Sequence, residues 1–418
     1  MKEEIIAGLD IGSTNIRLVI GQKVQGFEAE EIQIIGAVSS LTMGVSKGNV
    51  NSIEDATSSV SACLEKAERL VGVPLESVWV SINSPKIKCE KSKGVVVVSK
   101  SDGEIDEHDM ERAIEAARSM VVPNNYEILH VIPIKFTIDN QEDIKDPIGM
   151  SGVRLEVETL IILGLSNQIK NLTKAIYRTG LDIEGLVLSS LAVAETVFDN
   201  RQKDLGAALI NMGATTTSLS VYEEGNLLHT AILPIGSDHI TNDIAIGLRC
   251  PINLAERIKI EYGHSESEAF TKKDEVDISQ LVKEEKISDN IGLISLKYVA
   301  EIIEARVEEI FEKVDEELKK IDRSGMLPAG AVLVGGGSLL QGIVETAKRK
   351  LRLPVSLGEA KNVKIAIDKA RNPEFLTALG LVVWGGHSLP NSAPNPFKKN
   401  ISNAFSKVKG FIGKMMPQ

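Results

Sequence analysis

Ile5-Ile6-Ala7-Gly8-Leu9-Asp10-Ile11-Gly12-Ser13-Thr14-Asn15 is the stretch that decides the fold of this chain. An apolar run ends in one acid, and a glycine with three small polar residues leads into a second apolar run, 16–20. This pattern predicts a β-hairpin whose tight turn exposes backbone N–H groups and hydroxyls. Because Gly12 lets the backbone approach closely, such a turn can bind phosphate oxygens. Asp10 ends the first strand, where a carboxylate can hold a hydrated Mg²⁺.

The second half of the chain contains a similar stretch. Leu9-Asp10-Ile11-Gly12-Ser13-Thr14 aligns with Ile210-Asn211-Met212-Gly213-Ala214-Thr215, and both copies continue as apolar strands. An internal repeat at this distance predicts two similar lobes, each with one phosphate-binding hairpin. Facing each other across a cleft, two such hairpins would clamp the phosphates of a nucleotide. The alternatives are a purely structural turn and a chance repetition.

Composition narrows the class of protein. With 418 residues and 43% hydrophobic content, the chain can bury a large core in two or more domains. Its three cysteines, Cys63, Cys89 and Cys250, lack metal-ligand spacing, which fits a reducing cytoplasm. We expect neither a signal peptide nor a transmembrane span. The net charge of −11 argues against general binding of nucleic acid.

Hydrophobic spacing predicts an alternating α/β chain with a compact insert near 85–165. Helices are expected at 55–71, 105–120, 165–179, 190–198, 238–248, 254–262, 291–321, 339–351 and 375–386. Strands are expected at 32–39, 78–82, 94–98, 127–138, 153–163, 182–188, 226–234 and 331–334. The polar stretch 265–289 is expected to form a hairpin and loops. The strand at 331–334 runs into Gly335-Gly336-Gly337-Ser338, which either packs on a nucleoside or makes a tight turn.

The last stretch of the chain is basic and amphipathic. A linker at 390–396 precedes a pattern that puts the apolar residues within one arc of a helical wheel: Phe397, Ile401, Phe405, Val408, Phe411, Ile412 and Met415. Lys399, Lys407 and Lys414 lie opposite that arc. The pattern is typical of an in-plane anchor on an anionic membrane, although a helix that docks on the body or on a partner is the alternative. Since each lysine contributes only about 1 kcal/mol, one tail binds weakly and many tails bind by avidity.

The two hairpins and the glycine turn resemble those of the actin/Hsp70/sugar-kinase superfamily. Two stretches narrow the resemblance to the FtsA family of bacterial cell-division actin homologues: Ile128-Leu129-His130-Val131-Ile132-Pro133 and Asp146-Pro147-Ile148-Gly149-Met150-Ser151-Gly152-Val153-Arg154-Leu155-Glu156-Val157. The stretch Ile232-Leu233-Pro234-Ile235-Gly236 and the amphipathic tail agree with it. The resemblance covers essentially the whole chain.

This resemblance implies an actin-like α/β fold of duplicated RNase H-like lobes, an FtsA-type 1C insert and a C-terminal amphipathic helix. The implied division is 1–84, 166–200 and 366–388 for subdomain 1A, 85–165 for 1C, 201–245 and 326–365 for 2A, 246–325 for 2B, 389–396 for the linker and 397–416 for the membrane-targeting helix.

The family resemblance also implies ATP with Mg²⁺ in the cleft, polymerisation, membrane attachment and recruitment of FtsZ at the division septum. Asp10 would lie by the metal, Glu256 and Lys259 by the ribose and adenine, and Arg306 in the surface for the FtsZ C-terminal peptide. The other nucleotide-binding residues would be Gly12, Ser13, Thr14, Asn15, Asn211, Gly213, Ala214, Thr215, Thr216, Gly236, Gly335, Gly336, Gly337 and Ser338. The protein would be cytoplasmic and peripheral on the inner face of the membrane.

Two positions depart from hydrolytic members of the superfamily. Asn211 stands where they carry a second acid, and Ser189 stands where they carry a Glu or Gln that orients water. We therefore expect slow or negligible ATP hydrolysis. The alternatives are a pilus-assembly actin homologue and a sugar-kinase-type phosphotransferase, and Asn211 and the basic tail count against the kinase. An Hsp70-like chaperone would need a peptide-binding domain for which no sequence remains.

Overall fold

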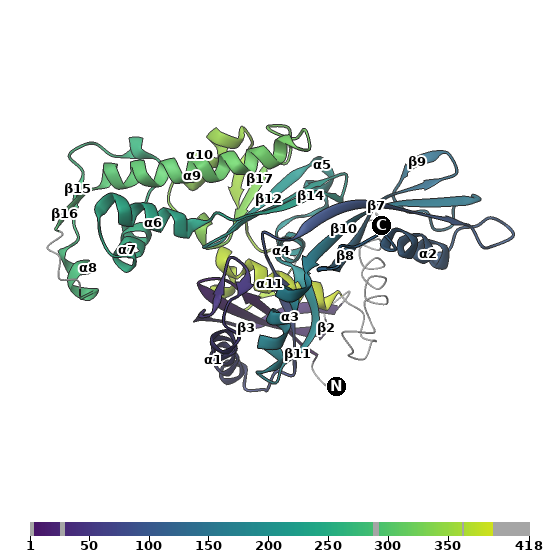
Figure 1. Ribbon diagram of the computed structural model, residues 1–418, viewed down its shortest axis with the longest axis horizontal. Helices are drawn as coiled ribbons and strands as arrows, with labels where there is room; N and C mark the ends of the chain where they lie inside the picture. Colours follow the sequence, from purple (N-terminus) through teal and green to yellow (C-terminus); the bar gives the residue numbers. More distant parts are fainter. Residues whose placement is uncertain (1–3, 26–29, 287–291, 362, 388–418) are drawn as a thin grey trace.

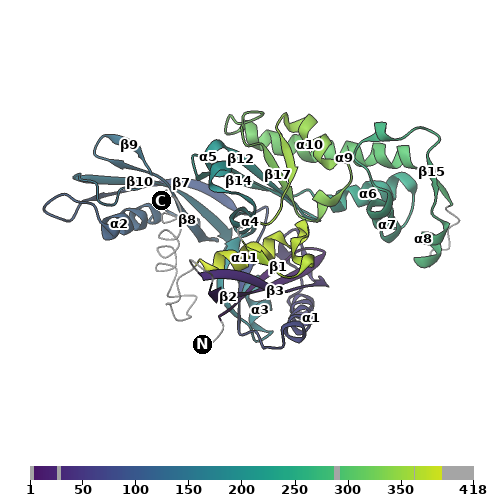
Figure 2. The ribbon, with the colours of Figure 1, turned by 180° about the vertical axis from the view of Figure 1, so that it is seen from behind.

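The computed structural model describes residues 4–25, 30–286, 292–361 and 363–387. Two lobes meet at the centre of an elongated molecule (Figure 1). The insert with α2 lies at one end of the long axis, and α7 and α8 lie at the other end, as the reverse view also shows (Figure 2). The predicted linker and amphipathic helix lie outside the described residues. Among those residues, no helix is both long and apolar enough to cross a membrane.

The first lobe is built on a six-stranded sheet of order β11-β6-β1-β2-β3-β19. The strands are β1 (Ile5–Ile11), β2 (Asn15–Gln25), β3 (Glu30–Leu41), β6 (Ser77–Ile82), β11 (Asp182–Leu188) and β19 (Lys364–Ile365). The predicted hairpin is confirmed, because β1 and β2 pair antiparallel with Asp10 opposite Arg17. Helices α1 (Ile53–Val71) and α3 (Ser166–Tyr177) belong to this lobe, with the short strands β4 (Val45–Ser46) and β5 (Asn49–Val50).

The second lobe repeats the plan on a five-stranded sheet of order β14-β13-β12-β17-β18. Its strands are β12 (Ala207–Met212), β13 (Thr217–Glu223), β14 (Asn226–Leu233), β17 (Ala331–Val334) and β18 (Val355–Leu357), with α10 (Ile343–Leu351) beside them. The second predicted hairpin is also confirmed, since β12 and β13 pair antiparallel. In both lobes the first hairpin strand pairs parallel with a strand from farther along the chain, β6 or β17.

The insert is a four-stranded antiparallel sheet of order β7-β10-β8-β9 with α2 packed on one face. Its elements are β7 (Lys88–Val97), α2 (Glu107–Arg118), β8 (Tyr126–Ile138), β9 (Gln141–Ile144) and β10 (Arg154–Leu165). The predicted acid cap is present as a capping box, in which Asp106 and Asp109 satisfy each other's backbone N–H groups. Asp109 is fully buried, and bonds from Ser99 and Arg112 outweigh burial and lower its pKa to about 2.

The outer part of the second lobe differs from the expectation. It contains α6 (Ser237–Leu248), α7 (Ile252–Tyr262), β15 (Glu275–Asp277), α8 (Ser279–Glu284), β16 (Leu293–Ser295) and α9 (Leu296–Lys319). The predicted single helix at 291–321 was wrong at its start, because Leu293 to Ser295 pair with β15. The polar stretch holds the short helix α8, whose Leu281 and Val282 are buried. Similarly, α10 begins at Ile343, after a 3₁₀ turn.

Two apolar helices, α4 (Ser189–Val197) and α11 (Leu376–Gly386), pack on each other and join the lobes. The short helix α5 (Asn200–Leu205) follows α4. Buried residues of both helices belong to the same core as residues of β12 and β17. A Cβ on Gly8 of β1 would lie 2.2 Å from the Ala378 carbonyl oxygen, so only glycine allows this approach. Because α11 contacts β1 and β2, and α4 contacts β12 and β13, the two packed helices hold the two hairpins in position.

Candidate functional site

A cleft with a volume of about 420 Å³ lies between the lobes, where the two hairpin turns meet. It lies within the size range of small-molecule sites. The cleft is lined by these predicted residues: Asp10, Gly12, Ser13, Thr14, Asn15, Asn211, Gly213, Ala214, Thr215, Thr216, Glu256, Lys259, Gly335, Gly336 and Gly337. Sequence segments from both halves of the chain thus converge on one cavity.

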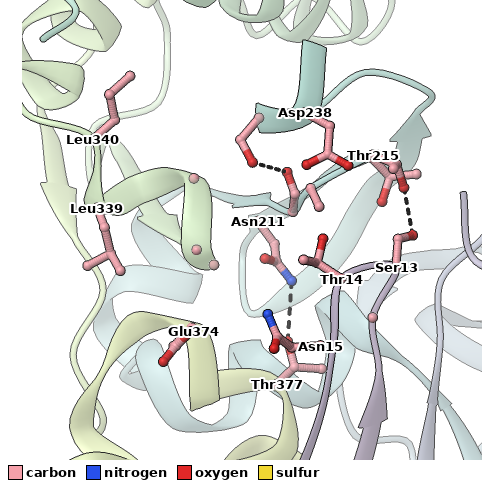
Figure 3. A pocket seen from close by; sticks show the side chains of 18 of the residues that line it. Ser13, Thr14, Asn15, Asn211, Thr215, Asp238, Leu339, Leu340, Glu374 and Thr377 are labelled. Carbon is pink, nitrogen blue, oxygen red and sulfur yellow. Dashed lines mark hydrogen bonds between the residues drawn. The ribbon is translucent and has the colours of Figure 1, made fainter. Parts of the chain in front are cut away.

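The two hairpin turns have the same backbone geometry. The Gly12 N–H donates to the Asn15 carbonyl at 3.1 Å, and the Gly213 N–H donates to the Thr216 carbonyl at 2.9 Å. Across the cleft, the hydroxyls of Ser13 and Thr215 lie 2.7 Å apart and form a hydrogen bond (Figure 3). The turns therefore face each other closely enough for one small anion to contact both.

Asp10 also lines the cleft, near the end of β1 and two residues before Gly12. The Ser81 hydroxyl donates to its Oδ1 at 2.6 Å. Burial raises the pKa of Asp10 above its ordinary value, and the Ser81 bond and the nearby Arg17 charge oppose that rise. Among the described residues no group of three His, Cys, Asp or Glu side chains could enclose a metal. A single carboxylate beside a phosphate site suits a cation that keeps its own waters, as Mg²⁺ does.

The corresponding end of β12 carries an amide. Asn211 Nδ2 donates to Thr377 Oγ1 of α11 at 3.4 Å (Figure 3). Ser189 also lines the cleft and is 2% exposed, and its hydroxyl has no hydrogen-bond partner among the described residues. The buried Oδ1 of Asn83 likewise lacks a hydrogen-bond partner in the part of the chain that the structure describes. Buried polar atoms that are unpaired at a cleft wall are typical of a ligand site.

The wall of the cleft away from the hairpin turns combines polar and apolar groups. Lys259 and Glu256 of α7 form an ion pair of 2.6 Å, and Lys259 also contacts Thr241 Oγ1 at 2.9 Å. Opposite them, Gly335 has a φ of +85°, and a Cβ there would lie 2.4 Å from Asn211 Oδ1. Apolar side chains of Ile260 and Leu339 complete the wall, and both are largely exposed. Polar groups and apolar surface together suit a ribose and a flat base.

Sequence reasoning missed several cleft residues. Asp238, at the start of α6, contributes a carboxylate whose pKa is raised by burial (Figure 3). Arg17 and Glu374 also line the cleft, and they form an ion pair with a 2.7 Å separation. The signal for Asp238 is its position, two residues after Gly236 and in the first turn of a predicted helix. The Arg17–Glu374 pair joins distant segments, so no local pattern indicated it.

Two predicted residues are placed behind the cleft wall instead of on it. Ser338 is buried, and its hydroxyl donates to the Gly335 carbonyl at 2.7 Å. Gly236 packs behind the second hairpin turn, where a Cβ would lie 2.5 Å from the Gly213 carbonyl and 2.6 Å from that of Ala214. Both residues therefore shape the turns and do not line the cavity.

Replacing Gly236 with alanine should displace the second turn. The added methyl group overlaps two carbonyl oxygens, and overpacking of this kind costs about 1–3 kcal/mol. We expect a lower melting temperature and weaker nucleotide binding, measured by thermal unfolding and by equilibrium titration. Gly292→Ala is the matched control, because Gly292 has no positive φ and a Cβ there would meet only Ser279 Oγ, at an ordinary 3.6 Å. Equal nucleotide affinity in Gly236→Ala and the parent would contradict this placement.

Comparison with known proteins agrees with this geometry. A family model described as the SHS2 domain inserted in FtsA matches residues 85–163, and one described as cell division protein FtsA matches residues 208–380. The chain is 33% identical to the cell division protein FtsA of Pseudomonas aeruginosa over 91% of this chain and 89% of that protein. The chain belongs to the FtsA family. The Neisseria meningitidis FtsA is 35% identical over 94% of this chain and 93% of its own length.

Solved structures confirm the actin-like fold of this FtsA-family chain. A chain of a PilM-PilN type IV pilus biogenesis complex has a TM-score of 0.64 at 16% identity, with 91% of this chain and 98% of that chain covered. MreB5 of Spiroplasma citri bound to ADP has a TM-score of 0.52 at 13% identity, with 92% and 96% covered. At such identities the likeness concerns the fold alone. The predicted membership of the FtsA family and the predicted actin-like architecture with an FtsA-type insert are therefore confirmed.

The FtsA resemblance assigned Arg306 to a partner surface, and the structure puts it outside the cleft. Arg306 lies on α9 with 24% of its side chain exposed, and its Nη2 donates to Asp243 Oδ1 of α6 at 2.9 Å. It also pairs with Glu309. The hydrogen bond to Asp243 is the largest cause of the raised pKa of Arg306, and the charges of Asp243 and Glu309 raise it further. Arg306 therefore ties α9 to α6, and its assignment to the partner surface stays a prediction.

Proposed function

We propose that this FtsA-family protein binds MgATP in the interlobe cleft, polymerises, and tethers FtsZ filaments to the cytoplasmic face of the membrane at the division septum. The observation that supports the nucleotide site best is the pair of matching hairpin turns that face each other beside Asp10. Exposed N–H groups and hydroxyls from two lobes favour a polyphosphate over a ligand with a single charged end.

The proposed fit of ATP follows the polarity of the cleft. The turns at 12–15 and 213–216 would hold phosphates, and the unpartnered Ser189 hydroxyl and Asn83 Oδ1 offer further polar contacts there. Asp10 would hold Mg²⁺ through water, and the metal would neutralise part of the phosphate charge. Glu256 and Lys259 would take the ribose and base, beside Ile260 and the glycine turn.

Slow hydrolysis is part of the proposal. Fast phosphoryl transfer to water needs a group that orients or deprotonates the water near the γ-phosphate. Asn211 has no basic oxygen of carboxylate strength, and Ser189 has only a hydroxyl. Asp238 and Glu256 are the cleft carboxylates of the second lobe, and Glu256 is assigned to the ribose. Asp238→Asn is therefore the variant that tests whether Asp238 acts as a base.

The proposed tethering function requires two binding surfaces, one for the membrane and one for FtsZ. The amphipathic residues 397–416 would bind an anionic leaflet, and the surface around Arg306 would bind the FtsZ C-terminal peptide. The test is reconstitution, in which fluorescent FtsZ, anionic vesicles and the full chain are mixed and sedimented. We expect FtsZ on the vesicles only when the protein is present. FtsZ that stays in solution despite vesicle-bound protein would contradict the tethering role.

Reversing the charge of Arg306 should abolish recruitment of FtsZ. Arg306→Glu removes the pair with Asp243 and puts three acids together, so a loss of at least about tenfold in peptide affinity is expected. The double variant Asp243→Arg with Arg306→Glu restores the ion pair between the helices without restoring the arginine. Fluorescence anisotropy with a labelled FtsZ C-terminal peptide distinguishes a direct role of Arg306 in binding from a role in stability alone. If the double variant binds the peptide normally, Arg306 acts only on stability and the partner assignment fails.

A further inference from the structure

His130 belongs to the stretch Ile128 to Pro133, for which the proposed function gives no role. It lies on β8 of the insert, where Ile162 of β10 pairs with His130 but Leu163 pairs with Ile128. Leu129 is therefore the extra residue of a β-bulge. A bulge of this kind changes the direction of the neighbouring side chains.

The imidazole of His130 caps a helix of the first lobe. Its Nε2 accepts the backbone N–H of Leu188 at 3.0 Å. Leu188 is the residue before α4, and it makes no side-chain cap. In α2 and α5 the third helical residue returns a bond to the N-cap N–H, but in α4 that residue is Leu191, which has no acceptor. The acceptor for α4 therefore comes from the insert.

The helix that His130 caps begins at the cleft. Ser189 is the first residue of the nine-residue α4, and it lines the cavity. Its side chain is buried, and no described residue forms a hydrogen bond with its hydroxyl, which leaves that oxygen for a ligand. The first N–H groups of a helix and its positive dipole end favour an anion at this position. The same imidazole lies edge-on to Trp384 of α11, with ring centroids 6.0 Å apart.

We propose that His130 is a positioning residue for the nucleotide site, through which the insert fixes the start of α4 and places Ser189 against the polyphosphate. This inference rests on the proposed binding of ATP. Because coupling between two binding events is reciprocal, a nucleotide in the cleft also strengthens the docking of the insert on the first lobe. The insert is then a part of the nucleotide site as well as an appendage of the lobe.

The test uses the full chain and three variants. His130→Phe keeps an aromatic edge for Trp384 but removes the acceptor, whereas His130→Gln offers Oε1 near the original Nε2. Ser295→Ala is the matched control, because it removes the cap of α9, where the Tyr298 N–H donates to Ser295 Oγ at 3.4 Å, far along the chain from α4. Two quantities are measured: the dissociation constant of a fluorescent ATP analogue with Mg²⁺, and amide hydrogen exchange of residues 186–192 without nucleotide.

We expect His130→Phe to bind the analogue about fivefold more weakly and to exchange faster at 186–192. His130→Gln should restore both quantities, and Ser295→Ala should change neither. Unchanged exchange in His130→Phe, or an unchanged dissociation constant while the parent binds, overturns the positioning role and leaves the ATP proposal standing. If the parent does not bind the analogue at all, the ATP proposal fails and the inference fails with it.

Discussion

Replacing Asp10 with asparagine is expected to raise the melting temperature of the nucleotide-free protein at pH 7 and to weaken MgATP binding by at least about tenfold. Burial raises the folded-state pKa of Asp10, so its stability contribution is present below the unfolded value of 3.8 and is lost as pH rises through the folded-state pKa. At pH 7, above the unfolded value, the burial of this carboxyl group therefore lowers the stability of the nucleotide-free protein. Asparagine keeps an acceptor for Ser81 and removes the charge.

Thermal melts with and without MgATP measure both effects in one experiment. The parent should gain stability from the nucleotide, and Asp10→Asn should begin higher and gain little. Ser81→Ala is the control, because it keeps the carboxylate and removes a bond that lowers its pKa. A variant that melts below the parent without nucleotide, or that gains as much from MgATP, would show that Asp10 has another role.

Removing the chain after Asn391 is expected to abolish sedimentation with anionic vesicles. The deletion takes away all the residues of the apolar arc and five lysines, which lie at positions 398, 399, 407, 409 and 414. A helix that lies in the interface is held by its buried apolar area and by attraction to anionic lipids. The truncated protein, which keeps the described residues up to His387, should otherwise keep its melting temperature and its nucleotide affinity.

Single substitutions in the full chain separate the two contributions to membrane binding. Lys407→Gln should weaken vesicle binding by about fivefold, since one lysine near an anionic surface contributes about 1 kcal/mol. Phe405→Asp puts a charge within the apolar arc and should reduce binding much further. If the truncated protein sediments as well as the full chain, the anchor lies elsewhere and the tail docks on the body or on a partner.

The sequence predicted the two hairpins well because each is local. Asp10 and Gly12 lie within one strand and turn, and the repeat at Asn211 and Gly213 indicated that the lobes are paired. The position of the cleft depends on the parallel pairing of β1 with β6 and of β12 with β17. The order of the elements in the sequence made such pairing plausible but did not indicate which strands pair. In the folded protein, the residues of both turns that were predicted to bind phosphate line one cavity.

What could not be predicted depends on contacts between distant segments. Nothing near Arg17 indicates that Glu374 is its partner, and nothing near Leu188 indicates that His130 caps it. Gly236 and Ser338 were assigned to the ligand by pattern, whereas packing places them behind the turns. The strand β16 was read as helix because its three residues precede a long helical pattern, and only pairing with β15 distinguishes it.

The proposed function requires that the cleft hold MgATP without cleaving it rapidly. The direct measurement mixes the full-length protein with ATP labelled at the γ-phosphate, in the presence of Mg²⁺, and follows both bound nucleotide and released phosphate over time. We predict about one bound nucleotide per chain and phosphate release well below about one per second. Release faster than about one per second, or no retained nucleotide at all, would contradict the claim.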